Sequence, residues 1–168
     1  PGYAYAHNNL GITLQELGRL DDAEASFRKA IALKPGFAEA HSNLGNTLKE
    51  LSRLGDAEAS YRKAIVLRPD CAEVHNNLGT TLRELGRLDE AEASYKKAIA
   101  LRSDCAGTHD NLGTTLRALG RLDESEASYR EAIALKPDFA EAHNNLGVTL
   151  RELGRFDEAE ASYRKALA

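Results

Sequence analysis

Apolar side chains recur along the chain with the spacing of amphipathic helices, and the segments that carry them come in pairs. In the first segment His7, Leu10, Leu14 and Leu17 follow one another at steps of three, four and three residues, which puts all four on one helix face. The next segment, residues 20–31, carries a second stripe with the same helical spacing. The pattern therefore predicts two consecutive amphipathic helices with a short connection between them.

The connections contain residues that end one helix and start the next. Gly18 follows the first stripe, where a glycine can take up the left-handed conformation that closes a helix. Asp21, three residues later, is a residue type that caps the N-terminus of a following helix. Further along, Pro69 stops a helix, and Asp70 and Glu73 have the spacing of a capping box for the next one. Both connections therefore predict helix-turn-helix units.

This arrangement repeats at a fixed period of 34, counted from each histidine of one motif to the next. That histidine marks the same place in every repeat: His7, His41, His75, His109 and His143. The copies are very similar, since residues 69–100 and 137–168 are identical at 26 of 32 positions. We therefore predict an all-α solenoid with five helix-turn-helix repeats in a single array over residues 1–168. The repeats are about 1–34, 35–68, 69–102, 103–136 and 137–168.

Small residues set how closely the two helices of a repeat can approach. A glycine inside a helix costs about 1 kcal/mol relative to alanine, yet the first helix of every repeat has one: Gly11, Gly45, Gly79, Gly113 and Gly147. We expect each glycine to face a small residue of the partner helix, and an aromatic residue to fill the space beside that contact. The small residues are Ala23, Ala57, Ala91, Ser125 and Ala159, and the aromatic ones are Phe27, Tyr61, Tyr95, Tyr129 and Tyr163.

Pairs of opposite charge also recur on the second helix of each repeat. The acid stands four residues before the base, the order that stabilises a helix by about 0.2–0.5 kcal/mol per pair. The five pairs are Glu24–Arg28, Glu58–Arg62, Glu92–Lys96, Glu126–Arg130 and Glu160–Arg164. Their regular placement supports the prediction of a second helix in every repeat.

These residues resemble the signature of the tetratricopeptide repeat family. The third repeat carries it as His75, Leu78, Gly79, Leu82, Ala91, Tyr95 and Ala98, and the closing proline occurs as Pro35, Pro69 and Pro137. Departures are few: Ser52 replaces the turn glycine, Gly55 the N-cap aspartate and Ser103 the boundary proline. The resemblance covers the whole chain. It implies a right-handed superhelix whose concave groove binds proteins or peptides.

The His-Asn-Asn-Leu-Gly motif is most similar to the superhelical subfamily, which includes the repeats of O-linked N-acetylglucosamine transferase and of related bacterial proteins. The 168 residues leave no room for a transferase domain. Because the sequence begins in a boundary turn and ends inside a predicted helix, we expect the chain to be a fragment of a longer protein. No polar capping helix follows residues 156–168. We therefore expect the apolar face of this last helix to be partly exposed and to favour end-to-end self-association.

Composition and charge narrow the range of functions. Hydrophobic residues make up 42% of the chain, and the net charge is −4 without a basic cluster, which argues against nucleic-acid binding. No apolar run approaches the roughly 18–20 residues of a membrane span, and the start of the sequence is not a signal peptide. Two cysteines do not make a disulfide framework, so we expect a reducing compartment and place the protein in the cytoplasm.

No set of residues points to catalysis, a cofactor or a metal. The sequence contains no nucleophile elbow, phosphate-binding loop, dinucleotide fingerprint or zinc-binding helix motif. Histidines of neighbouring repeats lie at least a helix-packing distance of roughly 8–10 Å apart, whereas zinc binds nitrogen at about 2.0–2.1 Å. Cys71 and Cys105 are also one repeat apart, beyond the roughly 7 Å Cα limit of a disulfide. We therefore expect core histidines, free thiols and a protein that is not an enzyme.

The face of the first helix opposite its apolar stripe is the candidate binding surface, because the family resemblance implies that this face lines the groove. An asparagine recurs there in every repeat: Asn9, Asn43, Asn77, Asn111 and Asn145. A carboxamide carries an acceptor and donors side by side, so this asparagine row can pair with the main chain of an extended peptide. It resembles the asparagine ladder of the transferase superhelix. The alternative is that the asparagines hydrogen-bond only within the stack.

A mostly cationic row runs beside the asparagine row: Gln15, Lys49, Arg83, Arg117 and Arg151. Acids flank most of its members, which is typical of a solvated face of mixed charge. The fourth repeat differs, because Gly107 and Ala118 replace both acids near Arg117, and an acidic ligand group is most expected there. The carboxylate clamp of chaperone-binding relatives needs Lys or Arg where this chain has Glu and Asn, which argues against chaperone tails as ligands.

Two functions remain open at this point. The first is a scaffold that binds a protein or an extended peptide through the asparagine and cationic rows. The second is a structural or self-assembling array, natural or engineered, with no dedicated ligand. The near-identity of the repeats favours the second. The unbroken asparagine row favours the first, as does a neighbouring position that varies as Ile12, Asn46, Thr80, Thr114 and Val148.

Overall fold

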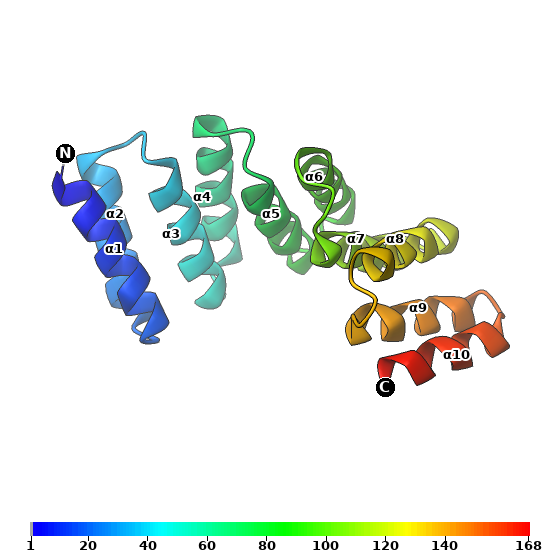
Figure 1. Cartoon of the computed structure of the whole chain (residues 1–168). Helices are drawn as coiled ribbons and strands as arrows, with labels where there is room; N and C mark the ends of the chain where they lie inside the picture. The colour runs from blue at the N-terminus through cyan, green and yellow to red at the C-terminus, as the bar shows by residue number, and fades with distance from the viewer. Residues whose placement is uncertain (1) are drawn as a thin grey trace. The chain divides into compact units, whose positions relative to one another are not determined.

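The computed structural model describes residues 2–168 and is entirely helical over that range. The ten helices are α1 (Gly2–Glu16), α2 (Leu20–Leu33), α3 (Ala38–Glu50), α4 (Leu54–Leu67), α5 (Ala72–Glu84), α6 (Leu88–Leu101), α7 (Ala106–Ala118), α8 (Leu122–Leu135), α9 (Ala140–Glu152) and α10 (Phe156–Ala166) (Figure 1). Each repeat contributes two of them, so the prediction of an all-α chain of five helix-turn-helix repeats is confirmed.

The helices form two compact units, Pro1–Leu85 with α1 to α5 and Gly86–Ala168 with α6 to α10. In the first unit α1 packs on α2 and α3 on α4, and α2 and α4 in turn contact the first helix of the following repeat. In the second unit α7 pairs with α8 and α9 with α10, while α6 and α8 contact the next first helix. Each unit is therefore a stack of helical hairpins, and its core lies between successive hairpins.

The turn between the two helices of a repeat closes as the glycine predicts. Gly18, Gly120 and Gly154 have φ values of +72°, +75° and +77°, in the left-handed region that glycine enters without strain. Ser52 takes the same conformation, with φ of +59°, in the one repeat that lacks the glycine. The position therefore requires the left-handed conformation whichever residue occupies it.

The predicted N-caps are wrong. Helix α2 begins at Leu20 with Arg19 as the N-cap residue, and Asp21 lies inside its first turn without a capping hydrogen bond. The Arg19 carbonyl accepts the first helical hydrogen bond, from the Ala23 N–H at 3.0 Å, so the helix starts before the aspartate can cap it. Acidic residues in this turn instead face the positive end of the helix dipole.

The predicted capping box at the repeat boundary is also wrong. Cys71, rather than Asp70, is the N-cap residue of α5, and no side chain caps this helix. The boundary turn is held by the histidine instead, because the His75 Nε2–H donates to the Pro69 carbonyl at 3.0 Å. This bond fixes the position of the turn against the helix that follows it.

The glycines inside the first helices are packed against aromatic rings. A Cβ atom at Gly45 would lie 2.7 Å from Cε1 of Tyr61, which is fully buried. Gly11, Gly113 and Gly147 meet Phe27, Tyr129 and Tyr163 in the same way. The close approach that we predicted is present, but the nearest group is the aromatic ring itself rather than the small residue beside it.

Burial along the first helix differs in part from the apolar stripe. Leu14 is buried, whereas Leu17, which follows the last residue of α1, is 66% exposed. Leu10 is 49% exposed, although its counterparts in later repeats are buried: Leu44, Leu78, Leu112 and Leu146. In those repeats the leucine faces the preceding repeat. The pattern also missed four fully buried threonines, Thr47, Thr81, Thr115 and Thr149.

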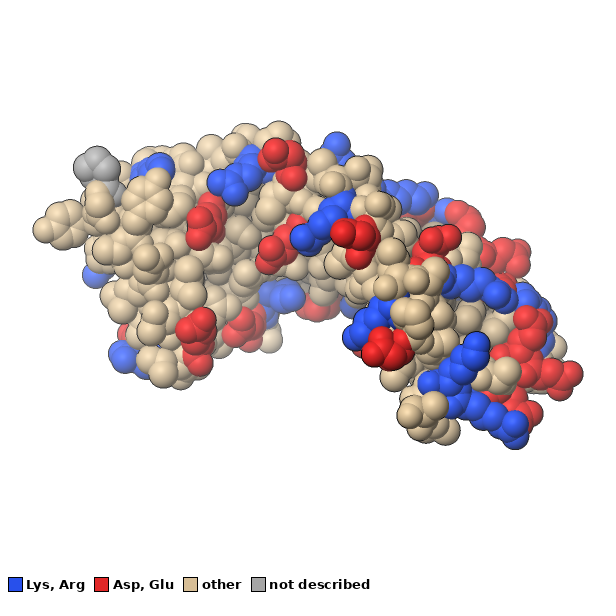
Figure 2. Space-filling view, in the orientation of Figure 1, with Lys and Arg blue, Asp and Glu red and all other residues tan. Residues whose placement is uncertain are grey.

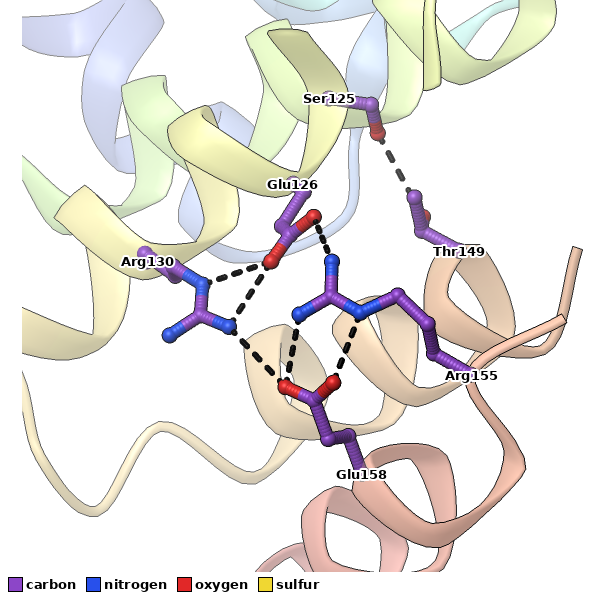
Figure 3. A network of polar contacts seen from close by, with 6 residues as sticks. All are labelled: Ser125, Glu126, Arg130, Thr149, Arg155 and Glu158. Carbon is purple, nitrogen blue, oxygen red and sulfur yellow. Dashed lines mark hydrogen bonds and ion pairs between the residues drawn. The ribbon is translucent and has the colours of Figure 1, made fainter. Parts of the chain in front are cut away.

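Ion pairs tie successive second helices together. All five predicted i,i+4 pairs form, with N–O distances of 2.6–2.8 Å. The arginine at the turn of the next repeat adds a second contact: Arg155 binds Glu126 of the previous repeat and Glu158 of its own, each at 2.6 Å (Figure 3). Arg121 joins Glu92 and Glu124 in the same way. In the second unit these bridges join α6 to α8 and α8 to α10.

Candidate functional site

The asparagine row lies on the first helix of each repeat at one register position. Asn9 is exposed, and Asn43, Asn77, Asn111 and Asn145 are half-buried. The helix also holds the row through a buried hydroxyl one turn later, since Thr47 Oγ1 donates to the Asn43 carbonyl at 3.1 Å. Thr81, Thr115 and Thr149 make the equivalent bond. The row therefore stands on a backbone whose carbonyls are already paired.

The side chains of the row are bonded to the preceding repeat. Asn43 Nδ2 donates to Oδ1 of Asn8 at 3.1 Å, and Asn145 Nδ2 donates to Oδ1 of Asp110 at 3.1 Å. Asn77 Nδ2 donates to Oδ1 of Asn46, also at 3.1 Å. A carboxamide has two N–H donors and an acceptor oxygen. One of the two donors in each of these three side chains is therefore used within the stack.

None of the row's partners was predicted from the sequence to bond to the row, although Asn46 had been noted as a varying neighbouring position. Asn8 is 1% exposed and Asp110 is 6% exposed, although both lie on the helix face that we expected to point away from the core. They are buried because the next repeat covers them. The motif itself carried the signal, since the residue before each row asparagine is polar in all five repeats: Asn8, Ser42, Asn76, Asp110 and Asn144.

The cationic row has acidic neighbours from the following repeat. Gln15 Nε2 donates to the Glu50 carboxylate, and Arg117 Nη1 lies 3.2 Å from Glu152 Oε1. Both contacts join residues 35 positions apart. Figure 2 shows the same mixture over the face in view, where Lys and Arg lie beside Asp and Glu. The expected face of mixed charge is therefore present in the pairs that the structure describes.

The expectation that Arg117 lacks an acid is wrong. Gly107 and Ala118 do remove the acids of its own repeat, but stacking brings Glu152 of the next repeat to it. Tyr129 also interacts electrostatically with the guanidinium. Burial alone would lower the pKa of Arg117, but Tyr129 and Glu152 together raise it, so the side chain is a charged and already partnered cation.

The histidines serve the turns between repeats. The Nε2–H groups of His41, His109 and His143 donate to the carbonyls of Pro35, Ser103 and Pro137 at 2.9–3.1 Å. Burial lowers the pKa of His41, which favours the neutral form of the ring. Within residues 2–168 no three histidine, cysteine or acidic side chains gather as metal ligands would. Together with His75, these three histidines therefore have a structural hydrogen-bonding role in the turns.

Two further features bear on the site. Cys71 and Cys105 are free thiols, both half-buried. Over the described part of the chain, no helix has the length and apolar character needed to cross a membrane. The candidate site itself consists of the carboxamides of the asparagine row, the cations of the cationic row and their acidic partners, all on the first helices.

Comparison with known proteins identifies the repeats. Profiles described as tetratricopeptide repeat match residues 4–37, 36–104, 70–138 and 111–168. No curated protein sequence matches. A crystal structure of MamA is 28% identical with a TM-score of 0.89, covering 94% of this chain and 92% of that chain.

Two other solved structures share the fold at lower identity. MamA from Desulfovibrio magneticus RS-1 is 17% identical with a TM-score of 0.93, covering 99% of this chain and 94% of that one. YrrB, described as a TPR protein with an unusual peptide-binding site, is 24% identical with a TM-score of 0.82, covering 96% and 83%. The family profiles extend over all five repeats, and the helices fall where that repeat has them. The chain therefore belongs to the tetratricopeptide repeat family.

Proposed function

We propose that this chain is a protein-binding scaffold that holds an extended peptide segment along the asparagine row. The observation that carries the proposal is that row residues in three repeats are held in place by hydrogen bonds to a neighbouring polar side chain. Binding groups that are held in position before the ligand arrives lose less conformational entropy on binding. The description of YrrB as having a peptide-binding site supports this use of the fold.

The carboxamide N–H and C=O groups that are not bonded within the stack suit a peptide main chain. Asn43 and Asn145 each use one N–H within the stack, which leaves a second N–H and the oxygen for a ligand. Asn9 is exposed and its side chain bonds to no other residue of the described chain, so its whole carboxamide is open. An extended peptide presents N–H and C=O groups at regular intervals. Such hydrogen bonds involve only the main chain of the peptide, so peptides of many different sequences can make them.

The cationic row supplies the second part of the proposed surface. We include Lys49, Arg83, Arg117 and Arg151 because they stand on the same helices as the asparagine row. Arg117 is already bonded to Glu152, so an acidic ligand group would have to displace that carboxylate. Its contribution is therefore smaller than that of a cation without such a partner.

The remaining parts of the proposal concern the whole protein. We infer that the five repeats act as one array, that the chain binds rather than catalyses, and that it works in the cytoplasm. The free, half-buried thiols of Cys71 and Cys105 support a reducing compartment. The mixed charge of the surface supports a protein ligand in preference to a nucleic acid.

The test is a peptide-library screen followed by titration of any hit against asparagine variants. Asn9→Ala is the most informative single change, because this side chain supports no other residue. Asn77→Ala and Asn145→Ala each remove a bond within the stack as well, so their folding is checked by circular dichroism. Asn144→Ala is the matched control, since this exposed asparagine lies beside the row.

We expect each row variant to weaken binding by about 0.5–1.5 kcal/mol per lost hydrogen bond, with little dependence on peptide side chains or salt. Losses should add across the row, and Asn144→Ala should bind as the parent does. A peptide that binds the folded Asn9, Asn77 and Asn145 triple variant as tightly as the parent would refute the main-chain role. A steep loss of affinity with salt would instead point to the cationic row.

Self-assembly is the second candidate function, favoured by apolar side chains at both ends of the array. Leu10 is 49% exposed where its counterparts are buried, and Phe156 in α10 and Leu167 just after it are 67% and 87% exposed. These are the two halves of a contact that recurs inside each unit. We expect head-to-tail association of this 168-residue chain, and Leu10→Glu should suppress it. Sedimentation that shows only monomer at high concentration would exclude this function.

A further inference from the structure

A pocket of about 280 Å³ lies between the second and third repeats. Its apolar walls are Ala38 of α3, Ala64 of α4 and Val74 of α5. Arg68 and Cys71, from the connection between α4 and α5, line it as well. All of these residues belong to the first unit, so the pocket is a property of one stack.

The equivalent place one repeat earlier is filled by an aromatic ring. Phe37 holds the position in the second repeat that Cys71 holds in the third, and it is 6% exposed. Its ring centroid lies 4.8 Å from that of Tyr5, and the Lys34 ammonium lies 5.0 Å from it. The alanines clustered with it are Ala4, Ala30 and Ala40, which are the counterparts, one repeat earlier, of the three wall residues of the pocket. The pocket therefore occupies the position of a missing phenylalanine side chain.

The second unit also has a phenylalanine beneath a cation at this position. Phe139 is the counterpart of Cys71 between the fourth and fifth repeats, and the Lys136 ammonium lies 5.1 Å from its ring centroid. A cation above an aromatic face is attractive by about 0.5–1 kcal/mol or more. Arg68 takes the place of Lys136 in the second repeat. That junction has kept the cation and two of the alanine walls, Ala38 and Ala64, whereas Val74 replaces an alanine, Glu39 replaces a tyrosine and Cys71 replaces the phenylalanine.

We propose that an aromatic side chain of a bound peptide fills this pocket, in the place that Phe37 occupies one repeat earlier. The proposal rests on the proposed function, because Asn43 of the asparagine row also lines the pocket. A peptide along the row can therefore insert one side chain here. Pockets for drug-sized ligands have roughly 300–1,000 Å³, so a volume of about 280 Å³ suits a single side chain.

The polar residues of the pocket do not favour a cationic ligand side chain. Glu39 and Glu73 line it, but Arg68 lines it too and opposes a second positive charge. Glu39 also accepts a hydrogen bond from Asn8 at 3.4 Å. Burying an ammonium against three aliphatic walls would require more complete pairing than these groups offer. An aromatic ring in the pocket can contact the apolar walls and also lie beneath the guanidinium of Arg68.

A small probe tests the pocket without the asparagine row. N-acetyl-phenylalanine amide is titrated into the ¹⁵N-labelled protein, with N-acetyl-alanine amide and N-acetyl-lysine amide as comparisons. We expect the phenylalanine probe alone to shift the amide signals of Ala64 and Val74. Cys71→Ser, the matched control, keeps the pocket open and should respond as the parent does. Cys71→Phe fills the pocket, should raise the melting temperature, and should abolish the shifts.

Arg68→Gln provides a second variant that leaves the walls intact. Loss of the cation should weaken the phenylalanine probe about two- to five-fold. An absence of shifts in the parent protein would overturn the proposal whether or not peptides bind the row. Equal shifts with the lysine probe, or unchanged shifts in Cys71→Phe, would overturn it as well.

Peptides separate this inference from the proposed function. A peptide found in the screen is compared with versions that carry Phe or Ala at each position in turn. At one position we expect Phe to bind about ten-fold or more tightly than Ala, since burial of the ring is worth at least that. Asn9→Ala should weaken both versions equally and leave the ratio unchanged. Cys71→Phe should bring the ratio to one, and a ratio that survives this change would refute the pocket.

Discussion

Replacing Gly45 by alanine adds one methyl group at a very close contact inside the second repeat. The new Cβ would lie 2.7, 2.8 and 2.9 Å from Cε1, Cδ1 and Cζ of Tyr61. Carbon atoms pack at about 3.5–4.0 Å, so the ring or the helix has to move back by about 1 Å. Tyr61 is fully buried, and its hydroxyl donates to Asn46 Oδ1 at 2.7 Å. The ring is therefore held at both ends and cannot turn aside.

Two effects of opposite sign decide the size of the change. Alanine is preferred over glycine inside a helix by about 1 kcal/mol, which would stabilise α3. Overpacking a well-filled core costs about 1–3 kcal/mol. Because the contact involves the face of an anchored ring rather than the end of a flexible chain, we expect overpacking to win. The net free energy of unfolding should fall by about 1 kcal/mol, and Gly45→Leu should lower it further.

Urea unfolding followed by circular dichroism measures this difference, with Gly55→Ala as the matched control. Gly55 lies in α4 of the same unit, and a Cβ there would meet nothing within 4 Å. This control should be unchanged or stabilised by up to about 1 kcal/mol. If Gly45→Ala proved as stable as Gly55→Ala, the ring would not require glycine. Combining Gly45→Ala with Tyr61→Leu should recover part of the loss, because the smaller side chain makes room for the methyl group.

Two further predictions concern charge and backbone. Burial alone would raise the pKa of Glu92, but hydrogen bonds from Lys96 and Arg121 lower it. The ionised carboxylate therefore stabilises the fold above the unfolded pKa of about 4.3. This stabilisation is lost as the pH falls through the lowered pKa of the folded state. Glu92→Gln should therefore destabilise by about 1 kcal/mol at pH 7 and flatten the acid limb of a stability–pH curve; an unchanged curve would contradict this. Ser52 has a φ of +59°, a conformation that is strained for a residue other than glycine. Ser52→Gly should therefore stabilise the protein by about 1 kcal/mol, measured by urea unfolding. A loss of stability would show that the serine is not strained.

The fold could be predicted from the sequence because its signals are local and repeated. The step of three and four residues from His7 to Leu14 defines a helix face within one segment, and Gly18 marks its end. Repetition of these signals at a fixed period leaves a stack of hairpins as the arrangement that buries all the stripes. The prediction of the N-cap residues was wrong for a reason that is also local. A residue type such as Asp21 is common at a helix start, but backbone bonding decides which position begins the helix.

The candidate site could be located from the sequence, but its bonding partners could not. The asparagine row follows from helix geometry within one repeat. Whether Asn43 meets Asn8 depends on the rotation and translation between repeats, which a single helix does not specify. The same limit produced the wrong expectation for Arg117, whose acid, Glu152, belongs to the next repeat. The period of the repeat does carry this information once one contact between repeats is known.

Departures from the repeat show which positions can have acquired a property of their own. Ser125 replaces the alanine of every other repeat at a fully buried position, but its hydroxyl donates to the Gly113 carbonyl at 2.8 Å and lies 3.4 Å from Thr149 Oγ1 (Figure 3). That change is satisfied inside the protein and needs no ligand. Cys71 also departs from the phenylalanine of two other repeats, and although Val74 is larger than its counterpart Ala40, a pocket of about 280 Å³ remains there. A ligand side chain can fill the space beside Cys71, because this pocket lies next to the asparagine row.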